Sequence, residues 1–212
     1  MDTYNQEIKK ISRERLLSHA IDSLTKKRAT SILVTRKHFD KITEHFNALF
    51  YQCLDGKHPE IEAMYKQDFE NKRLEWFKHY SNYTKPKSAK ELKVLYLCGP
   101  EPLNDITVLL NNGIKLENIW GVESDKASYN SAIESLRNVN MPIKIHRGKL
   151  AEFFEFTNHE FDIIYFDACS PILSPKDSPL EILKQIFVSK RLTNQSALIT
   201  NFAEPGTNYD WG

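Results

Sequence analysis

Two different patterns of hydrophobic residues divide the chain near residue 90. Up to that point apolar residues recur at spacings of three and four, as on one face of a helix, and Gly56 is the only glycine. This spacing predicts three helices. Their apolar positions are Ile8, Ile11, Leu16, Leu17, Ala20, Ile21 and Leu24, then Phe39, Ile42, Phe46, Leu49, Phe50 and Cys53, and then Ile61, Met64, Tyr65, Phe69, Trp76, Phe77 and Tyr80.

Breaking residues mark the ends of these predicted helices. Asp55 and Gly56 are expected to end the second helix, and Pro59 suits the first position of the third. Residues 81–90 lack the helical periodicity and contain a proline, which predicts a linker.

After residue 91, short apolar runs rich in Val, Ile, Leu and aromatic residues alternate with helical segments. The runs predict strands at 94–98, 118–122, 143–146, 161–167 and 196–202. Such alternation predicts an α/β fold with a mostly parallel sheet covered by helices on both faces. We therefore expect a helical N-terminal region with its linker at 1–90 and an α/β domain at 91–212.

Composition narrows the class of protein. The chain has 212 residues, of which 41% are hydrophobic and 27% charged, which is typical of a soluble globular protein. No apolar run approaches the ~20 residues that a membrane span needs. The first residues are charged where a secretory signal would be apolar, so we expect a cytoplasmic protein with no membrane partner.

Cysteine and histidine usage gives no sign of a metal site. Cys53, Cys98 and Cys169 lie far apart and lack CxxC spacing, which supports neither a disulfide framework nor a zinc ribbon. His38 and His45 could share a helix face, but no third ligand stands at a suitable spacing. We expect Cys98 and Cys169 to be small buried residues rather than nucleophiles.

Charge is distributed unevenly along the chain. Residues 1–90 hold 18 Lys and Arg against 12 Asp and Glu, a net +6, whereas residues 91–212 hold 11 against 16, a net −5. Aromatic and basic residues also interleave from Trp76 to Lys90. This stretch could make a weak contact with single-stranded nucleic acid, or its aromatic residues could pack on the α/β core.

Candidate chemistry gathers where the predicted strands end, because ligands of open parallel sheets bind beyond the carboxyl ends of the strands. Cys98, Gly99 and Glu101 follow the first strand, Glu123 and Ser124 end the second, Lys149 and Leu150 follow the third, and Asp167 ends the fourth.

Glu123 is the most informative of these residues. It lies 24 positions after Gly99, and an acid about there accepts hydrogen bonds from ribose hydroxyls. Alternatively, Glu123 only precedes the helix at 126–138, for which Asp125 is the better N-cap.

The turn after the first strand disfavours a dinucleotide. It carries one glycine, Gly99, and both Pro100 and Pro102 lack the backbone N–H groups that a pyrophosphate needs. A cofactor without phosphates fits better. Asp167 could orient a substrate amine or hydroxyl or act as a base, or it could cap the turn into Ser170 and Pro171.

With these residues in view, the segment 94–203 resembles the cofactor half of a class I S-adenosylmethionine-dependent methyltransferase. VLYLCGPEP, NIWGVESD, IKIHRGKLAEFF and FDIIYFDACSP resemble the first four motifs of that family. The resemblance implies a Rossmann-like fold and S-adenosylmethionine as cofactor. It also implies that Gly99 and its neighbours approach the methionine part, Glu123 holds the ribose, Lys149 and Leu150 border the adenine, and Asp167 faces the methyl group and an unassigned methyl acceptor.

The motifs also depart from the family pattern. Tyr96 or Leu97 replaces an acid near the end of the first strand, Gly99 alone remains of the glycine-rich turn, and Lys149 stands where an acid commonly meets the adenine amine. Two other interpretations of the function therefore remain open. One is a methyltransferase-like binding or scaffold module without turnover, and the other is a nucleic-acid-binding protein that uses the basic N-terminal region.

The chain ends soon after the fifth predicted strand. Family members normally add two more strands, so we expect either a missing C-terminal segment or a second subunit to cover the edge of the fifth strand, since an unpaired apolar edge favours aggregation.

Overall fold

The computed structural model describes residues 6–31, 36–53, 59–168, 170–175 and 178–204. They fall into two compact units. One unit combines the chain up to Thr25 with the chain from Lys87 onward, and the other comprises Lys26–Pro86.

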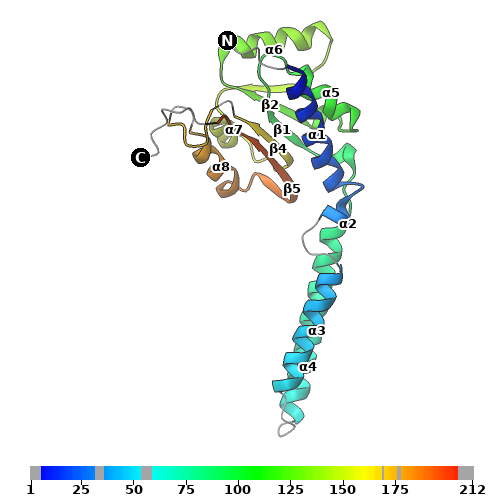
Figure 1. Ribbon diagram of the computed structural model, residues 1–212. Coiled ribbons are helices and arrows are strands. Elements are labelled where there is room, and N and C mark those ends of the chain that lie inside the picture. Colours follow the sequence, from blue (N-terminus) through cyan, green and yellow to red (C-terminus); the bar gives the residue numbers. More distant parts are fainter. Residues whose placement is uncertain (1–5, 32–35, 54–58, 169, 176–177, 205–212) are drawn as a thin grey trace. The chain divides into compact units, whose positions relative to one another are not determined.

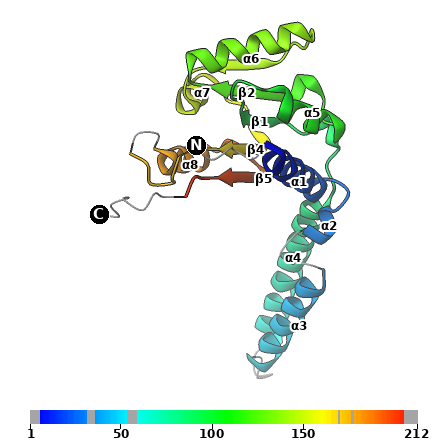
Figure 2. The same cartoon turned by 45° about the horizontal axis from the view of Figure 1, so that its top comes forward.

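The first unit contains a five-stranded, entirely parallel sheet. Its strands are β1 (Val94–Leu97), β2 (Ile119–Glu123), β3 (Lys144–Arg147), β4 (Phe161–Asp167) and β5 (Leu192–Asn201). They lie in the order β3-β2-β1-β4-β5. Figure 2 shows β4 and β5 side by side with their arrowheads at the same end. The order and direction are those of the Rossmann-like α/β fold, which confirms the predicted fold class.

Strand β5 differs most from its predicted bounds. It begins at Leu192, before the predicted start at residue 196. The register shifts there, because Phe161 pairs with Leu192 whereas Ile163 pairs with Ala197. The intervening residues are polar, so the apolar pattern could not reveal them. Within the described residues no strand pairs with the outer edge of β5, and the covering of that edge stays a prediction.

Helices follow each of the first four strands, as a parallel sheet requires. They are α5 (Leu103–Asn111), α6 (Lys126–Asn138), α7 (Leu150–Phe156) and α8 (Pro179–Val188), with short 3-10 turns η1 (Ala89–Glu91) and η2 (Leu116–Asn118). Figure 1 shows α7 and α8 on one side of the sheet and α5 on the other.

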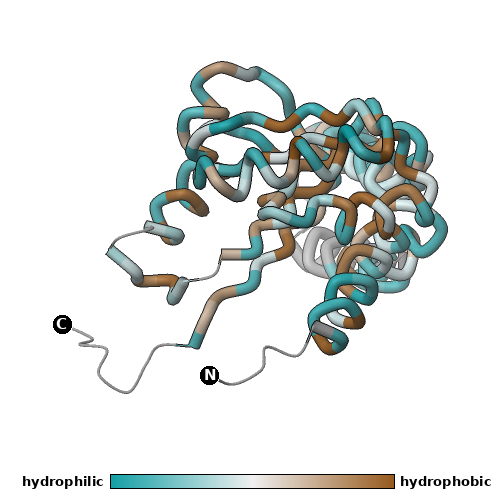
Figure 3. The backbone as a smooth tube through the Cα atoms, turned by 90° about the horizontal axis from the view of Figure 1, so that it is seen from above, coloured by the Kyte–Doolittle hydropathy of each residue, from teal (hydrophilic) through white to brown (hydrophobic). Residues whose placement is uncertain are grey.

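Two apolar clusters, one on each face of the sheet, form the core. Alternate strand residues supply them, because successive side chains of a strand point to opposite faces. Val94, Tyr96 and Cys98 pack on the α5 side, whereas Leu95 packs on the α7 side. The tube coloured by hydropathy shows hydrophobic and hydrophilic positions interspersed along the chain (Figure 3).

The N-terminal helix α1 (Gln6–Leu24) belongs to this unit, unlike the expected division at residue 90. Leu17, Ala20, Ile21 and Leu24 are buried in the cluster on the α5 side. These four residues lie on one helical face, and that face covers the sheet. Ile8, Ile11 and Leu16, which were expected on the same apolar face, are exposed.

The second unit consists of α2 (Arg28–Ser31), α3 (Arg36–Cys53) and α4 (Pro59–Thr84). Helix α4 extends into the segment predicted as a linker. No residue of this unit whose exposure is described is buried, and Trp76 is 68% exposed. The apolar positions predicted for the third helix are thus largely on the surface.

Parts of the sequence prediction for this unit lie outside what the structure describes. These parts are residues Asp55 and Gly56 and the side chains of Phe39, Phe46, Leu49, Phe50, Cys53 and Ile61.

Candidate functional site

The candidate site lies where the order of the strands reverses. The chain proceeds from β1 outward to β2 and β3, then returns to add β4 and β5 on the other side of β1. The carboxyl ends of β1 and β4 therefore flank the switch point at which open α/β sheets bind ligands. By strand alternation, Tyr96, Glu123, Tyr165 and Asp167 all point to the α5 side of the sheet.

Gly99 opens a space beside this edge. Its φ is +58°, a left-handed conformation that glycine adopts without strain, and a Cβ built there meets no atom within 4 Å. The preceding Cys98 is buried, and its N–H donates to the carbonyl of Val122 at 3.1 Å. Burial, followed by the charges of Glu123 and Asp105, raises the pKa of the Cys98 thiol to about 12. Cys98 is therefore a protonated packing residue at neutral pH.

Glu123 ends β2 beside this opening and is half-buried. Its Oε1 accepts a hydrogen bond from the Asp125 N–H at 2.7 Å, and its main-chain carbonyl accepts one from the Gly148 N–H at 3.0 Å. Asp125 caps α6, because its Oδ2 accepts from the Ser128 N–H at 2.8 Å. The capping role thus belongs to Asp125, and Glu123 keeps a carboxylate oxygen, Oε2, with no hydrogen bond among the described residues.

Asp167 ends β4 on the same side of the sheet. Its Oδ1 accepts from the Asn201 side-chain amide at 2.8 Å, and its Oδ2 lies 3.4 Å from the Tyr165 hydroxyl. Burial, and then the charges of Asp167 and Asp105, raise the pKa of Tyr165. The phenol consequently stays neutral, and Asp167 is held as a fixed hydrogen-bond acceptor.

Sequence reasoning missed an ion pair at this edge. Asp105, in the first turn of α5, has its Oδ1 at 2.7 Å from Nε of Arg13 on α1. The N–H direction misses the oxygen, so the contact is an ion pair without an aligned hydrogen bond. Burial raises the pKa of Asp105 to about 6, the charge of Asp167 adds to this, and Arg13 and Lys9 oppose it. The signal available in the sequence was an acid, Asp105, six positions after Gly99 and at the start of the helical segment that follows the first strand.

Tyr96 adds an unpaired polar atom to the same face. It is 1% exposed, and its hydroxyl has no hydrogen-bond partner among the described residues. Burial, and then the charges of Cys98 and Asp105, raise the pKa of this phenol. A buried hydroxyl without a partner is costly, which points to a ligand atom or water as its partner.

The other predicted site residues are either exposed or buried on the opposite face of the sheet, or lie outside the described residues. Glu101 is exposed and accepts from the Asn104 side chain at 2.8 Å, and Ser124 is exposed. Lys149 is exposed at the start of α7, where its N–H donates to Glu152 Oε2 at 3.0 Å. Leu150 is buried in the cluster on the α7 side, so the structure does not bring it to the Glu123 side of the sheet. Cys169 lies outside the described residues.

The start of α5 offers few donors to a phosphate. The N–H groups of Asn104, Asp105 and Ile106 donate to the carbonyls of Glu101 and Pro102, and the two prolines of the turn carry no N–H. A pyrophosphate would need such donors. The geometry therefore fits a ligand that lacks phosphates, as the sequence predicts.

No helix within the described ranges has the length and apolarity to cross a membrane. In the same residues no group of three or more His, Cys, Asp and Glu side chains could hold a metal ion.

Comparison with known proteins gives likenesses to solved structures alone. No protein-family model and no curated protein matches the chain. The plantazolicin methyltransferase BamL, solved with a triazolic desmethylPZN analog and SAH, matches with a TM-score of 0.40 and 19% identity over 50% of this chain and 36% of that one.

Two further structures are similarly distant. An S-adenosylmethionine-dependent methyltransferase from Clostridium acetobutylicum has a TM-score of 0.38 and 17% identity over 77% of this chain and 57% of its own. The precorrin 8w decarboxylase from Methanobacterium thermoautotrophicum has a TM-score of 0.38 and 14% identity over 52% and 54%. The match spans less than two thirds of each of these three chains, so the fold assignment rests on the strand order.

Proposed function

We propose that the chain binds S-adenosylmethionine at the carboxyl ends of β1, β2 and β4 and transfers its methyl group to an acceptor. One observation carries this proposal. Glu123 ends β2 with a carboxylate oxygen directed to no described partner, beside the switch point and the open turn at Gly99.

Residues of this chain fit the parts of such a cofactor. Glu123 would accept hydrogen bonds from the ribose hydroxyls. The space above Gly99 would admit the chain that leads from the ribose, and the Tyr96 hydroxyl offers a donor that lacks a partner. The start of α5 holds few donors for phosphates, and S-adenosylmethionine contains none.

The acceptor's amine or hydroxyl would lose one proton on methylation, and Asp167 at the end of β4 would be the carboxylate that takes it. The cofactor supplies an electrophilic methyl group when bound. Asp167, fixed by Asn201, would accept a hydrogen bond from the acceptor's amine or hydroxyl and so orient its lone pair. Rate would come mainly from this positioning and from exclusion of water by α1 and α5.

Calorimetric titration with S-adenosylmethionine and S-adenosylhomocysteine tests the proposal, with NAD as a dinucleotide control. Glu123→Gln should weaken binding by about 1.5–3 kcal/mol, the range for a hydrogen bond to a charged group. Glu117→Gln is the matched control, because Glu117 is an exposed acid at the opposite end of β2 whose carboxylate meets only Lys115 among the described residues. Equal affinity in both variants and the wild type would refute the role of Glu123.

The second candidate function is that of a binding module without catalytic turnover. The surroundings of the Asp167 carboxylate favour this candidate. Both carboxylate oxygens already have neighbours, Asn201 and Tyr165. Single-turnover incubation with methyl-labelled cofactor and a cell extract separates the two candidates. Label transfer supports the enzyme, whereas tight cofactor binding without transfer supports the module.

A further inference from the structure

The face of α1 that covers the sheet changes character along its length. From Leu17 to Leu24 this face is apolar and buried. One and two turns earlier, the same face carries Arg13 and Lys9, both partly buried, whereas their neighbours along the helix are exposed. The inner face of α1 is thus basic in its first half and apolar in its second.

The basic half lies at the carboxyl end of the sheet. Arg13 meets Asp105 in the first turn of α5, and Ser18 accepts a hydrogen bond from Asn112 just beyond the end of α5, so the two helices run in the same direction. At its other end α1 reaches the amino ends of the strands, where the carbonyl of Leu24 accepts from the Lys87 N–H at 2.9 Å. Arg13 and Lys9 therefore stand over the edge that holds Gly99.

Opposite charges meet at this edge. Arg13 and Lys9 both lower the pKa of Asp105, and Asp167 raises it, so each of these three charges acts on Asp105. The Arg13 side chain is 16% exposed and that of Asp105 8%. Arg13 forms no other ion pair or hydrogen bond within the described part of the chain, and the ion pair engages its Nε. The two terminal nitrogens of the guanidinium are the part that suits a carboxylate in a bidentate contact.

We propose that Arg13 binds the carboxylate, and Asp105 the ammonium group, of an α-amino-acid moiety on the ligand held above Gly99. The inference rests on the proposed function, because the methionine end of S-adenosylmethionine is such a moiety. When a zwitterionic ligand binds, the ion pair between Arg13 and Asp105 is replaced by two ion pairs, one between Arg13 and the ligand carboxylate and one between Asp105 and the ligand ammonium group. Helix α1 therefore sets the specificity for the amino-acid end, and Glu123 sets it for the ribose.

The experiment compares two ligands that differ at this end. S-adenosylhomocysteine carries the α-amino acid, and 5′-methylthioadenosine lacks it. Arg13→Met should weaken binding of S-adenosylhomocysteine by about 10- to 100-fold, since a hydrogen bond to a charged group contributes about 1.5–3 kcal/mol. Binding of 5′-methylthioadenosine should change by less than about threefold. Arg15→Met is the matched control, because Arg15 is exposed on α1 and should affect neither ligand.

Loss of Arg13 also leaves Asp105 buried without its cation, which endangers folding. The double variant Arg13→Met/Asp105→Asn removes both charges and keeps the experiment interpretable. It should bind 5′-methylthioadenosine like the wild type and lose the preference for S-adenosylhomocysteine. Thermal melting of each variant without ligand records the structural effect separately.

The outcomes separate the two proposals. If a folded Arg13 variant binds both ligands as the wild type does, or loses both equally, Arg13 is a structural residue and the inference is overturned while the proposed function stands. If the wild type binds neither ligand, the proposed function itself fails. A loss confined to S-adenosylhomocysteine supports both.

Discussion

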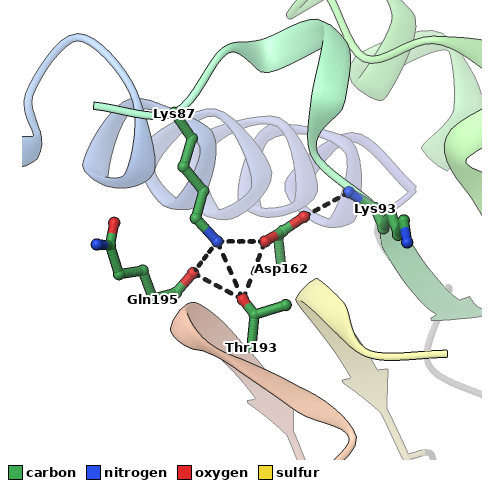
Figure 4. Close-up of polar contacts among 5 residues, drawn as sticks. All are labelled: Lys87, Lys93, Asp162, Thr193 and Gln195. Atoms are coloured by element: carbon green, nitrogen blue, oxygen red, sulfur yellow. Dashed lines mark hydrogen bonds and ion pairs between the residues drawn. The ribbon is translucent and has the colours of Figure 1, made fainter. Parts of the chain in front are cut away.

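Lys87 forms an ion pair with Asp162 at the amino ends of β4 and β5, far from the candidate site (Figure 4). Its Nζ also donates to Thr193 Oγ1 at 3.0 Å and to the Gln195 carbonyl at 2.7 Å, and Asp162 Oδ2 accepts from the Lys93 N–H at 2.8 Å. The shifted register of β5 brings Thr193 and Gln195 to this lysine. The Lys87 ammonium group, which comes from the segment predicted as a linker, thus connects the residues just before β1 with the start of β5 through Asp162.

Replacing Lys87 should destabilise the protein more than replacing any exposed lysine. The side chains of Lys87 and Asp162 are 26% and 8% exposed, so Lys87→Met leaves a buried carboxylate without its cation. We expect a loss of about 3 kcal/mol in the free energy of unfolding. Lys85→Met, at an exposed position two residues earlier, should stay within about 0.5 kcal/mol of the wild type. Urea denaturation measures both, and equal midpoints for the two variants would contradict the prediction.

The sequence predicted the sheet well because the strands are nearly continuous apolar runs. β4 has the predicted bounds, β1 ends one residue earlier than predicted, and β2 and β3 each begin and end one residue later. The assignment of α1 failed for a physical reason. Periodicity shows that a helix has an apolar face, but it does not show which surface that face covers, and α1 covers the sheet.

The candidate site was predictable where it lies at strand ends. Glu123 and Asp167 occupy the expected edge on the same side of the sheet. Arg13 could not be placed there from sequence, because its position depends on how α1 packs against α5. Leu150 does not lie at this edge, because the first residue of α7 is buried on the opposite face of the sheet.

Gly99 and Gly121 should respond to substitution in different ways. Gly99 has a left-handed backbone and open space, so Gly99→Ala costs about 1–2 kcal/mol of strain, and Gly99→Asn costs less because asparagine tolerates this conformation. At Gly121 a Cβ would lie 3.2 Å from Cys98 Cβ and 3.3 Å from Ile145 Cγ1. Gly121→Ala should cost about 1–3 kcal/mol through overpacking, and Gly121→Asn more. Urea denaturation of the four variants checks this, and an asparagine that stabilises at both positions relative to alanine would contradict it.

Contact with nucleic acid, if it occurs through α4, should be weak and sensitive to salt. Trp76 is 68% exposed and could stack on a base, but Lys87 is engaged by Asp162 and unavailable to phosphates. Each neutralised phosphate of a single strand lowers log K by about 0.7 per decade of salt. Fluorescence anisotropy with a labelled single strand should show binding only at low salt. Trp76→Ala should reduce it, and Leu74→Ala, at a 59% exposed aliphatic position, should not. Tight binding at moderate salt would make nucleic acid the leading partner.

Asp105 should contribute more to the free energy of unfolding at mildly acidic pH than at neutral pH. Burial raises the pKa of Asp105 from 3.8 to about 6, so between these values the folded state holds a proton that the unfolded state has lost. The contribution of Asp105 therefore falls as pH rises from about 4 to about 6, by roughly 3 kcal/mol, since one pKa unit corresponds to about 1.4 kcal/mol. Asp105→Asn lacks this titration. The stability of the wild type relative to Asp105→Asn should thus be lower at pH 7 than at pH 4.5, as urea denaturation at the two pH values can measure. The opposite sign would mean that Arg13 outweighs burial and holds the pKa of Asp105 below its usual value.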